Sequence, residues 1–353
     1  MANVLIVDDS FFIRAAIRKI LESSNLVENV YEASNGLEAL DILKKQNIDL
    51  VTLDVEMPKM NGLETLERIK KENISTQIIM VSAYTTQGAK ETIKALELGA
   101  FDFIAKPKNY ADFYKVKDEL LKKVENALLK KRSITDKLKA LKESIVEKPI
   151  EKPPRPTSPI RKLGDKGVIA IGISTGGPQT LGEILPKLPA DYPYPIVIAI
   201  HMPDTFTKSF AEHLNSKCKL NVKEAEENEV LKPGTVYISR GRINMVITGN
   251  ENMPIVNYVK DDSIIYVPSA NLLLSSCAKI FKENTCGIVM TGMGDDGSKG
   301  IVDVKKNGGI TVAEDPKSAI LWAMPENAIK TGCVDFVLKK DEIPNFLLKI
   351  AKQ

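Results

Sequence analysis

Two hydrophobic patterns alternate along the first 125 residues of the chain. Continuous apolar runs such as "NVLIVDD", "IDLVTLD", "TQIIMVSA" and "AFDFIAK" are typical of strands that are covered on both faces. Between them, segments such as "SFFIRAAIRKILESS" and "NGLETLERIKKE" repeat apolar residues every three or four positions, as amphipathic helices do. Repeated strand–helix units predict a parallel sheet with helices on both sides.

The pattern changes twice before it resumes. From about residue 112 to 142 the chain is helical and basic, with an apolar stripe formed by Val116, Leu120, Val124 and Leu128. The prolines of "VEKPIEKPPRPTSPIRKLGDK" then exclude a helix interior and predict an exposed linker. The alternation returns after Gly167 in "PYPIVIAIH", "TCGIVMTG" and "GGITVAED". We therefore expect an α/β protein with two doubly wound parallel-sheet domains, residues 1–125 and 166–353, joined by a helical and then proline-rich linker at 126–165.

The composition argues against a nucleic-acid-binding, membrane-spanning or secreted protein. The 353 residues include 49 Lys and Arg against 46 Asp and Glu, so the net charge of +3 gives no general attraction to nucleic acid. No apolar run approaches the roughly 20 residues that span a bilayer, and "MANVLIVDD" has no signal-peptide features. The four cysteines form no C-x-x-C pair, which favours reduced thiols. We expect a cytoplasmic protein that neither inserts into membranes nor binds nucleic acid.

Polar and charged side chains close four of the predicted strands in the first domain: Asp8, Asp9, Asp54, Ser82 and Lys106. The carboxyl ends of parallel strands share one edge of the sheet, where ligands bind. Three carboxylates at one edge favour a hard divalent cation, and oxygen ligands suit Mg²⁺. Asp54 is then a candidate nucleophile toward a phosphoryl donor, with Lys106 and Ser82 as partners of the transferred group. A helix cap at Asp9 and a solvated charge at Lys106 are the simpler alternatives.

The combination "IVDDS…LDVEMPKMNG…VSA…AKP" closely resembles the receiver domain of response regulators, over about the first 125 residues. The resemblance implies a flavodoxin-like fold in which a histidine kinase phosphorylates Asp54. It also implies that the metal is held by Asp8, Asp9, Asp54 and the backbone carbonyl of Glu56. The family's switch positions correspond here to Ser82, Phe103 and Lys106.

The stretch "VIAIGISTGGPQTL" opens the second domain with a glycine-rich turn around Ser174. "GISTG" fits G-x-S-x-G, a strand-to-helix turn that exposes a serine hydroxyl. A phosphate-binding loop would need a Lys-Ser/Thr pair after the glycines, and the dinucleotide pattern would need glycine at position 174. Both are absent from this turn. A plain turn with a serine or threonine helix cap remains the alternative.

A serine nucleophile needs a neighbouring base, and the chain has two histidines. His213 lies in the polar-faced helix "TKSFAEHLNSKC", where a solvated histidine is expected. His201 ends the apolar strand "PIVIAIH", at the same predicted sheet edge as Ser174, and is the better base. The turn "TGMGDDGSKG" adds Asp295 and Asp296 there, one of which can orient an imidazole. A cation-binding acidic loop is the alternative for this turn.

Five segments, "IGISTGGPQTL", "HMPDTFTKSFAEHL", "KPGTVYIS", "MTGMGDDGSKG" and "AEDPKSAILWAMPENAI", together resemble the catalytic domain of chemotaxis protein-glutamate methylesterases. The resemblance covers nearly all of the chain after Gly167 and implies a Rossmann-like domain with no cofactor in its esterase site. Ser174 would attack, His201 would act as base and Asp296 would orient it. The resemblance further implies an oxyanion-hole N–H at Met293 and packing of Thr175 beside the histidine.

The sequence departs from the family pattern at a few other positions. Arg240, Gly241 and Asn244 stand where Pro-Gly and a nearby histidine are common, and Asn271 stands where aspartate is common. None of these positions belongs to the expected catalytic set. We therefore expect the departures to affect contacts with the substrate rather than the chemistry.

The resemblance implies a phosphorylation-activated esterase in chemotaxis adaptation. It would hydrolyse glutamate γ-methyl esters on the cytoplasmic helices of chemoreceptors, releasing methanol, with glutamine deamidation as a further family activity. A chemotaxis histidine kinase would be the phosphodonor. A DNA-binding response regulator would need a basic recognition helix, which the second domain lacks in its sequence pattern. A non-catalytic, phosphorylation-dependent signalling scaffold remains the competing hypothesis.

Overall fold

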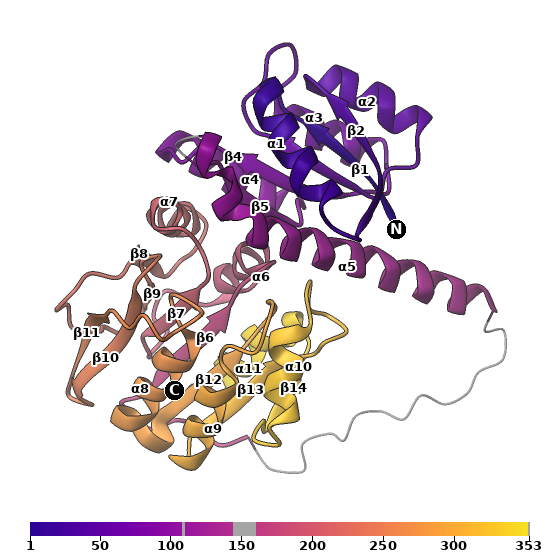
Figure 1. The fold of residues 1–353 in the computed structure, drawn as a ribbon. Coiled ribbons are helices and arrows are strands. Elements are labelled where there is room, and N and C mark those ends of the chain that lie inside the picture. The colour runs from indigo at the N-terminus through magenta and orange to yellow at the C-terminus, as the bar shows by residue number, and fades with distance from the viewer. Residues whose placement is uncertain (108–109, 144–159, 352–353) are drawn as a thin grey trace. The chain divides into compact units, whose positions relative to one another are not determined.

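The structure, a computed structural model, describes residues 1–107, 110–143 and 160–351, with only the backbone described at 110–111 and 132–143. The chain divides into two compact units, Met1–Glu151 and Lys152–Gln353 (Figure 1). The proline-rich part of the expected linker, residues 146–159, lies outside the described residues. No helix in the described ranges has both the length and the apolar character needed to cross a bilayer.

The first unit is a parallel five-stranded sheet with the order β2-β1-β3-β4-β5. Its strands are β1 Ala2–Val7, β2 Val27–Ala33, β3 Leu50–Asp54, β4 Gln77–Ser82 and β5 Asp102–Ala105. Its helices are α1 Phe11–Glu22, α2 Gly36–Lys45, α3 Gly62–Lys71, α4 Thr86–Glu97 and α5 Lys117–Glu143. This strand order is that of flavodoxin-like folds, as the resemblance to receiver domains implied.

Local sequence explains where these elements begin and what they bury. Every residue of β3 is buried, because both faces of the central strand are covered. Helix α3 begins with a capping box, in which the side chains of Asn61 and Glu64 each bond the other's backbone N–H. On α5, Leu120, Val124 and Leu128 are buried along the expected apolar stripe. The helix continues past residue 125 to Glu143.

The second unit is a parallel seven-stranded sheet with the order β14-β13-β12-β6-β7-β9-β8. Its strands are β6 Val168–Ile173, β7 Ile196–Ile200, β8 Asn221–Glu224, β9 Thr235–Ile238, β12 Thr285–Val289, β13 Ile310–Glu314 and β14 Phe336–Leu338. Its helices are α6 Gly177–Ile184, α7 Asp204–Asn215, α8 Ala270–Phe281, α9 Ser298–Lys306, α10 Ala323–Lys330 and α11 Ile343–Ile350. The prediction of two parallel-sheet α/β domains is confirmed.

A separate antiparallel hairpin, β10 Asn244–Asn250 and β11 Met253–Val259, interrupts the second unit. The doubly wound pattern did not predict it. Gly249, next to the turn, has φ +85°, and a side chain there would overlap the carbonyl oxygen of Met253. Three buried residues of the hairpin join the hydrophobic core beside α8: Met245, Ile247 and Val256.

The order of strands creates a switch point in the second sheet. Strand β6 lies between β7 and β12, so the chain winds outward from β6 in both directions. In open α/β sheets, ligands bind in the crevice beyond the carboxyl ends of strands at such a point. We therefore expect a ligand-binding site at the loops after β6, β7 and β12.

Candidate active site and phosphoacceptor site

Three neighbouring strands deliver Ser174, His201 and Asp296 to one edge of the second sheet. Ser174 directly follows β6, His201 directly follows β7, and Asp296 lies in the loop after β12. Backbone bonds align the strand ends: the His201 N–H donates to the Ile173 carbonyl at 3.3 Å, and the Ser174 N–H donates to the Thr291 carbonyl at 2.9 Å. The three residues are 27 and 95 positions apart along the chain but adjacent in space.

The three side chains form a continuous hydrogen-bonded relay. Oγ of Ser174 lies 3.0 Å from Nδ1 of His201, and Nε2 of His201 lies 2.8 Å from Oδ2 of Asp296. A carboxylate only accepts, so Nε2 carries the proton and Nδ1 presents a lone pair to the serine hydroxyl. Asp296 is fully buried, and Ser174 is only 8% exposed. This arrangement can activate an alcohol as a nucleophile.

The surroundings of Asp296 keep its carboxylate ionised. It accepts hydrogen bonds from the backbone N–H groups of Ala270 at 2.7 Å, Asn271 at 2.9 Å and Gly297 at 3.0 Å. Burial by itself would raise the pKa of Asp296, but the hydrogen bonds from His201, Asn271 and Ala270 outweigh it and hold that pKa below its usual value. Ala270 and Asn271 open helix α8, whose N-terminal end also favours a negative charge.

The adjacent Asp295 has a different environment from that of Asp296. Its side chain is exposed and interacts with Tyr266. Of the two carboxylates that the turn contributes, Asp296 is the one that bonds His201.

A buried network, which the sequence analysis missed, supports the turn around Ser174. The hydroxyl of Thr291 donates to the Thr175 carbonyl and accepts from the Leu321 N–H, both at 2.9 Å. The carboxylate of Glu314, at the end of β13, accepts from the Thr291 N–H at 2.9 Å. The signal that could have found Glu314 is a charged residue closing a fully buried strand.

Two glycines let the loop after β12 approach the relay closely. A side chain at Gly292 would place its Cβ 2.8 Å from Cβ of Ser174, and one at Gly294 would overlap the hydroxyl of Tyr266. Met293 lies between them, half-buried. The oxyanion-hole role of Met293 and the packing of Thr175 beside the histidine stay predictions.

The positions that depart from the family pattern have structural partners here. Oδ1 of Asn244 accepts from the Ser269 N–H at 2.8 Å, and Oδ1 of Asn271 accepts from the Gly300 N–H at 2.9 Å. The Arg240 guanidinium lies over the Tyr258 ring, 5.4 Å from its centre. Both asparagines thus support the first turn of α8, which holds Asp296.

The first unit brings four of its predicted site residues together. Ligand oxygens of Asp8, Asp9 and Asp54 lie within 4.8 Å of one another. Nζ of Lys106 lies 2.7 Å from Oδ2 of Asp54 and 2.9 Å from Oδ2 of Asp8. Burial raises the pKa of Asp54 to about 6 and also raises that of Asp8. Burial would lower the pKa of Lys106, but its attraction to Asp54 and Asp8 outweighs this and raises it.

This acidic cluster fits a hard cation. All three side chains offer carboxylate oxygens, and exposed Asp9 leaves the cluster open on one side, as suits a partly hydrated Mg²⁺. The raised pKa values of Asp8 and Asp54 show that the lysine alone does not compensate for their burial. The backbone of Glu56 interacts with the Asp54 carboxylate and tends to lower the pKa of Asp54.

The remaining predicted switch residues are Ser82, which ends β4, and Phe103, which lies within β5. The Ser82 hydroxyl donates to the Gly88 carbonyl at 3.0 Å. Phe103 is buried, and Nζ of Lys123 lies 5.1 Å from the centre of its ring. Their roles as switch partners stay predictions.

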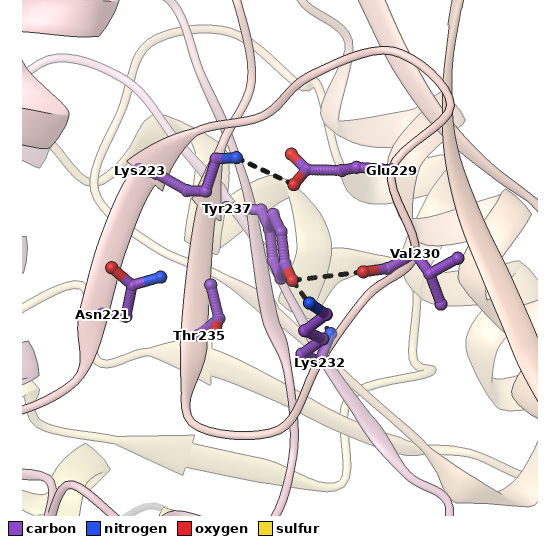
Figure 2. A pocket seen from close by; sticks show the side chains of 7 residues that line it. All are labelled: Asn221, Lys223, Glu229, Val230, Lys232, Thr235 and Tyr237. Atoms are coloured by element: carbon purple, nitrogen blue, oxygen red, sulfur yellow. Dashed lines mark hydrogen bonds and ion pairs between the residues drawn. The ribbon is translucent and has the colours of Figure 1, made fainter.

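A cavity of about 200 Å³ in the second unit lies apart from the relay (Figure 2). Asn221 and Thr235, the first residues of β8 and β9, line it. The cavity therefore lies toward the amino ends of these strands, whereas Ser174 follows the carboxyl end of a parallel strand. Two of its charged lining residues pair with each other, since Nζ of Lys223 lies 2.9 Å from the Glu229 carboxylate.

Comparison with known proteins covers both units. Residues 4–117 match the family model of the response regulator receiver domain, and residues 169–347 match that of the CheB methylesterase. A protein-glutamate methylesterase/protein-glutamine glutaminase of Pyrococcus horikoshii is 42% identical over 350 residues, 98% of this chain and 93% of that protein. The protein of the same name from Thermotoga maritima is 38% identical over 351 residues, 99% of this chain and 98% of that protein.

A solved structure supports the same assignment. The crystal structure of the Thermotoga maritima CheB methylesterase catalytic domain has 40% sequence identity and a TM-score of 0.51, and it covers 52% of this chain and 98% of its own. These matches confirm both resemblances found in the sequence. The chain belongs to the CheB methylesterase family, ester hydrolases of chemotaxis, and carries a response regulator receiver domain before its catalytic domain.

Proposed function

We propose that this chain hydrolyses glutamate γ-methyl esters on the cytoplasmic helices of chemoreceptors, with Ser174 as the nucleophile. The observation that carries the proposal is the relay of Ser174, His201 and Asp296, with its two links of 3.0 and 2.8 Å. Membership in the CheB methylesterase family supports the substrate class.

In the first half of the reaction, Oγ of Ser174 attacks the ester carbonyl carbon while Nδ1 of His201 accepts the hydroxyl proton. The imidazolium that forms is stabilised by the ionised Asp296 at Nε2. The carbonyl oxygen becomes an oxyanion, for which the N–H of Met293 is the proposed donor. Such a donor is worth roughly 3–4 kcal/mol of barrier. The C–O bond then breaks, and His201 gives its proton to the methoxy oxygen, so that methanol leaves.

In the second half, water attacks the acyl-serine ester and passes a proton to Nδ1 of His201. Collapse of this second intermediate returns the proton to Oγ of Ser174 and releases the glutamate carboxylate. The same acyl-enzyme would form from a glutamine side chain with ammonia as the leaving group. The relatives named protein-glutamine glutaminase support this deamidation as a second activity.

The receiver domain is the proposed control element. Asp54 would take a phosphoryl group from a phosphohistidine of a chemotaxis histidine kinase, as its carboxylate oxygen bonds to phosphorus and the P–N bond breaks toward the histidine. Asp8, Asp9, Asp54 and the Glu56 carbonyl would hold Mg²⁺, which when bound neutralises the crowded negative charge. Lys106 would pair with the phosphoryl oxygens, and Ser82 and Phe103 would respond to it.

Phosphorylation would then activate the esterase by shifting an equilibrium between inactive and active states. Phosphorylation must stabilise the active state relative to the inactive state by about 5 kcal/mol to move the population from mostly inactive to mostly active. The phosphoryl group would supply this through new charge-assisted hydrogen bonds in the receiver domain.

Methanol release from membranes that contain methylated chemoreceptors tests both claims. We expect release by the full chain, an increase when a small-molecule phosphodonor is added, and no release by Ser174→Ala. Asp54→Asn should keep the basal rate and lose the increase. Comparable release by Ser174→Ala would contradict the catalytic proposal. Full chemotactic adaptation in cells that carry only Ser174→Ala would instead favour a non-catalytic scaffold.

A further inference from the structure

The imidazole of His201 lies against the phenol ring of Tyr266. The two ring centres are 5.3 Å apart, and the ring planes differ by only 3°. This is an offset parallel stack, one of the favourable arrangements of aromatic pairs. Tyr266 belongs to the segment between β11 and α8, and no motif in the sequence pointed to it.

Tyr266 is itself held in place by the loop that carries Asp296. Its hydroxyl interacts with the backbone and the side chain of Asp295. Gly294, with φ +84°, leaves the space that the hydroxyl occupies, because any side chain there would overlap it. The carbonyl of Gly294 is in turn fixed by the side-chain amide of Asn327 at 2.9 Å. These contacts hold the phenol ring of Tyr266 in a fixed position beside His201.

The stacked ring restricts a motion of His201 that its two hydrogen bonds still allow. Bonds at Nδ1 and Nε2 define an axis through the imidazole, but the ring can still tilt about that axis. Contact with a flat, fixed phenol restricts this tilt, so that the Nδ1 lone pair stays directed at Oγ of Ser174. The face of the phenol also attracts the cation that exists after proton transfer.

We propose that Tyr266 is a positioning residue for His201: its ring holds the imidazole in the plane that joins Ser174 to Asp296. The inference rests on the proposed function, in which His201 is the base. Tyr266 itself touches no reacting atom in this proposal. Its effect should therefore fall on kcat and not on KM.

The kinetic test compares two substitutions in the full chain with phosphodonor present. Tyr266→Phe keeps the ring and removes the hydroxyl, whereas Tyr266→Leu removes the ring. We expect Tyr266→Leu to lower kcat about threefold to tenfold with KM unchanged, which is the range expected for one aromatic contact. Tyr266→Phe should keep at least half of the wild-type kcat.

Tyr258→Leu is the matched control. Tyr258 is also a half-buried tyrosine of the second unit, but its ring packs against Arg240. We expect Tyr258→Leu to lower the melting temperature and to leave the kcat per folded molecule unchanged. Equal losses of kcat in Tyr258→Leu and Tyr266→Leu would mean that general destabilisation, not positioning, explains the effect.

An NMR measurement tests the contact without relying on activity. The chain has two histidines, so selective ¹³C labelling of histidine gives two sets of ring signals, and His213→Asn assigns them. The ring protons of His201 should show an upfield ring-current shift in the wild type and in Tyr266→Phe, and lose it in Tyr266→Leu. The signals of His213 should not move.

The outcomes separate this inference from the proposed function. If the wild-type chain is active and Tyr266→Leu has the same kcat, the positioning role would be overturned. A Tyr266→Leu variant that changes only by a higher KM would overturn it as well. His201 signals that are the same in the wild type and in Tyr266→Leu would overturn the contact itself. A wild-type chain that shows the ring-current shift but releases no methanol would overturn the proposed function and leave the contact standing.

Discussion

Nε2 of His201 lies 2.8 Å from Oδ2 of Asp296, and the same oxygen accepts the Ala270 N–H at 2.7 Å. One carboxylate thus selects the histidine tautomer and also caps the first turn of α8. Both tasks need an ionised Asp296, because the groups that face it are N–H donors and both of its oxygens must accept. A neutral amide would place its own N–H group against one of these donors.

Asp296→Asn should therefore cost both activity and stability. An amide that donates to Nε2 would force the proton to Nδ1, where it blocks transfer from Ser174. We expect kcat to fall by roughly 10³ to 10⁴, as such a tautomer error does in other serine hydrolases, and the melting temperature of the second unit to fall as well. Methanol release and calorimetry measure the two effects.

The neighbouring carboxylate provides the comparison for Asp296→Asn. Asp295 is exposed and interacts with Tyr266 rather than with His201. Asp295→Asn should retain more than a tenth of wild-type kcat. If the two substitutions proved equally harmful, the assignment of Asp296 as the orienting carboxylate would be wrong.

Substitution by valine should have opposite effects on stability at two buried threonines, Thr291 and Thr180. Thr291→Val removes a hydroxyl that serves both the Thr175 carbonyl and the Leu321 N–H, so each loses a buried hydrogen bond. We expect a loss of about 1–3 kcal/mol in the free energy of unfolding. The Thr180 hydroxyl is also buried but has no hydrogen-bond partner among the described residues. Thr180→Val should be neutral or stabilising, and urea unfolding of the two variants gives the comparison.

Gly292→Ala should impair catalysis more than folding. The added methyl group would lie 2.8 Å from Cβ of Ser174 and overlap the sulfur of Met324. The methionine is flexible and can move, whereas Ser174 is held by its backbone bond to Thr291. We expect at least a tenfold fall in kcat, measured as methanol release.

Gly332→Ala should show the reverse behaviour. Gly332 has φ +71° but open space around its Cα, so alanine there strains the backbone without touching the relay. A loss of roughly 1 kcal/mol of stability with unchanged kcat is expected. If Gly292→Ala also left kcat unchanged, the close approach of this loop to Ser174 would have no catalytic role.

The stability of the first unit should depend on Mg²⁺ only at higher pH. Burial raises the pKa of Asp54 from 3.8 to about 6, so the folded state binds more protons than the unfolded state between these values. The stabilisation from this group is therefore complete below pH 3.8 and is lost as the pH rises through about 6. Above that pH the ionised carboxylates repel each other, and Mg²⁺ should restore stability.

Thermal melts of the full chain with and without Mg²⁺, at pH 5 and at pH 8, would measure this difference. We expect the ion to raise the melting temperature of the first unit at the higher pH and to have little effect at the lower one. Asp54→Asn should reduce the dependence on both pH and Mg²⁺, whereas Asp8, whose pKa burial also raises, should retain part of it. A rise of equal size at both pH values would contradict the part assigned to Asp54.

The sequence by itself predicted the alternating strands and helices of both units, though not the hairpin of β10 and β11, and the strand ends at which the chemistry lies. Apolar runs such as those of β3 and β6 are buried along their whole length, and such runs report on near neighbours in the chain. Because parallel strands share an edge at their carboxyl ends, placing Ser174 and His201 after two strands already predicted that they would lie at the same edge. The resemblance of the motifs then identified the family.

Only the tertiary structure decided which groups meet at that edge. The pairing of β12 with β6 brings Asp296 to His201 across 95 positions of sequence, and the residues alone did not distinguish it from Asp295. Tyr266, Thr291 and Glu314 were missed because their partners belong to other loops and strands. Such contacts depend on the packing of segments that are distant in sequence, and no local pattern of apolar and polar residues records that packing.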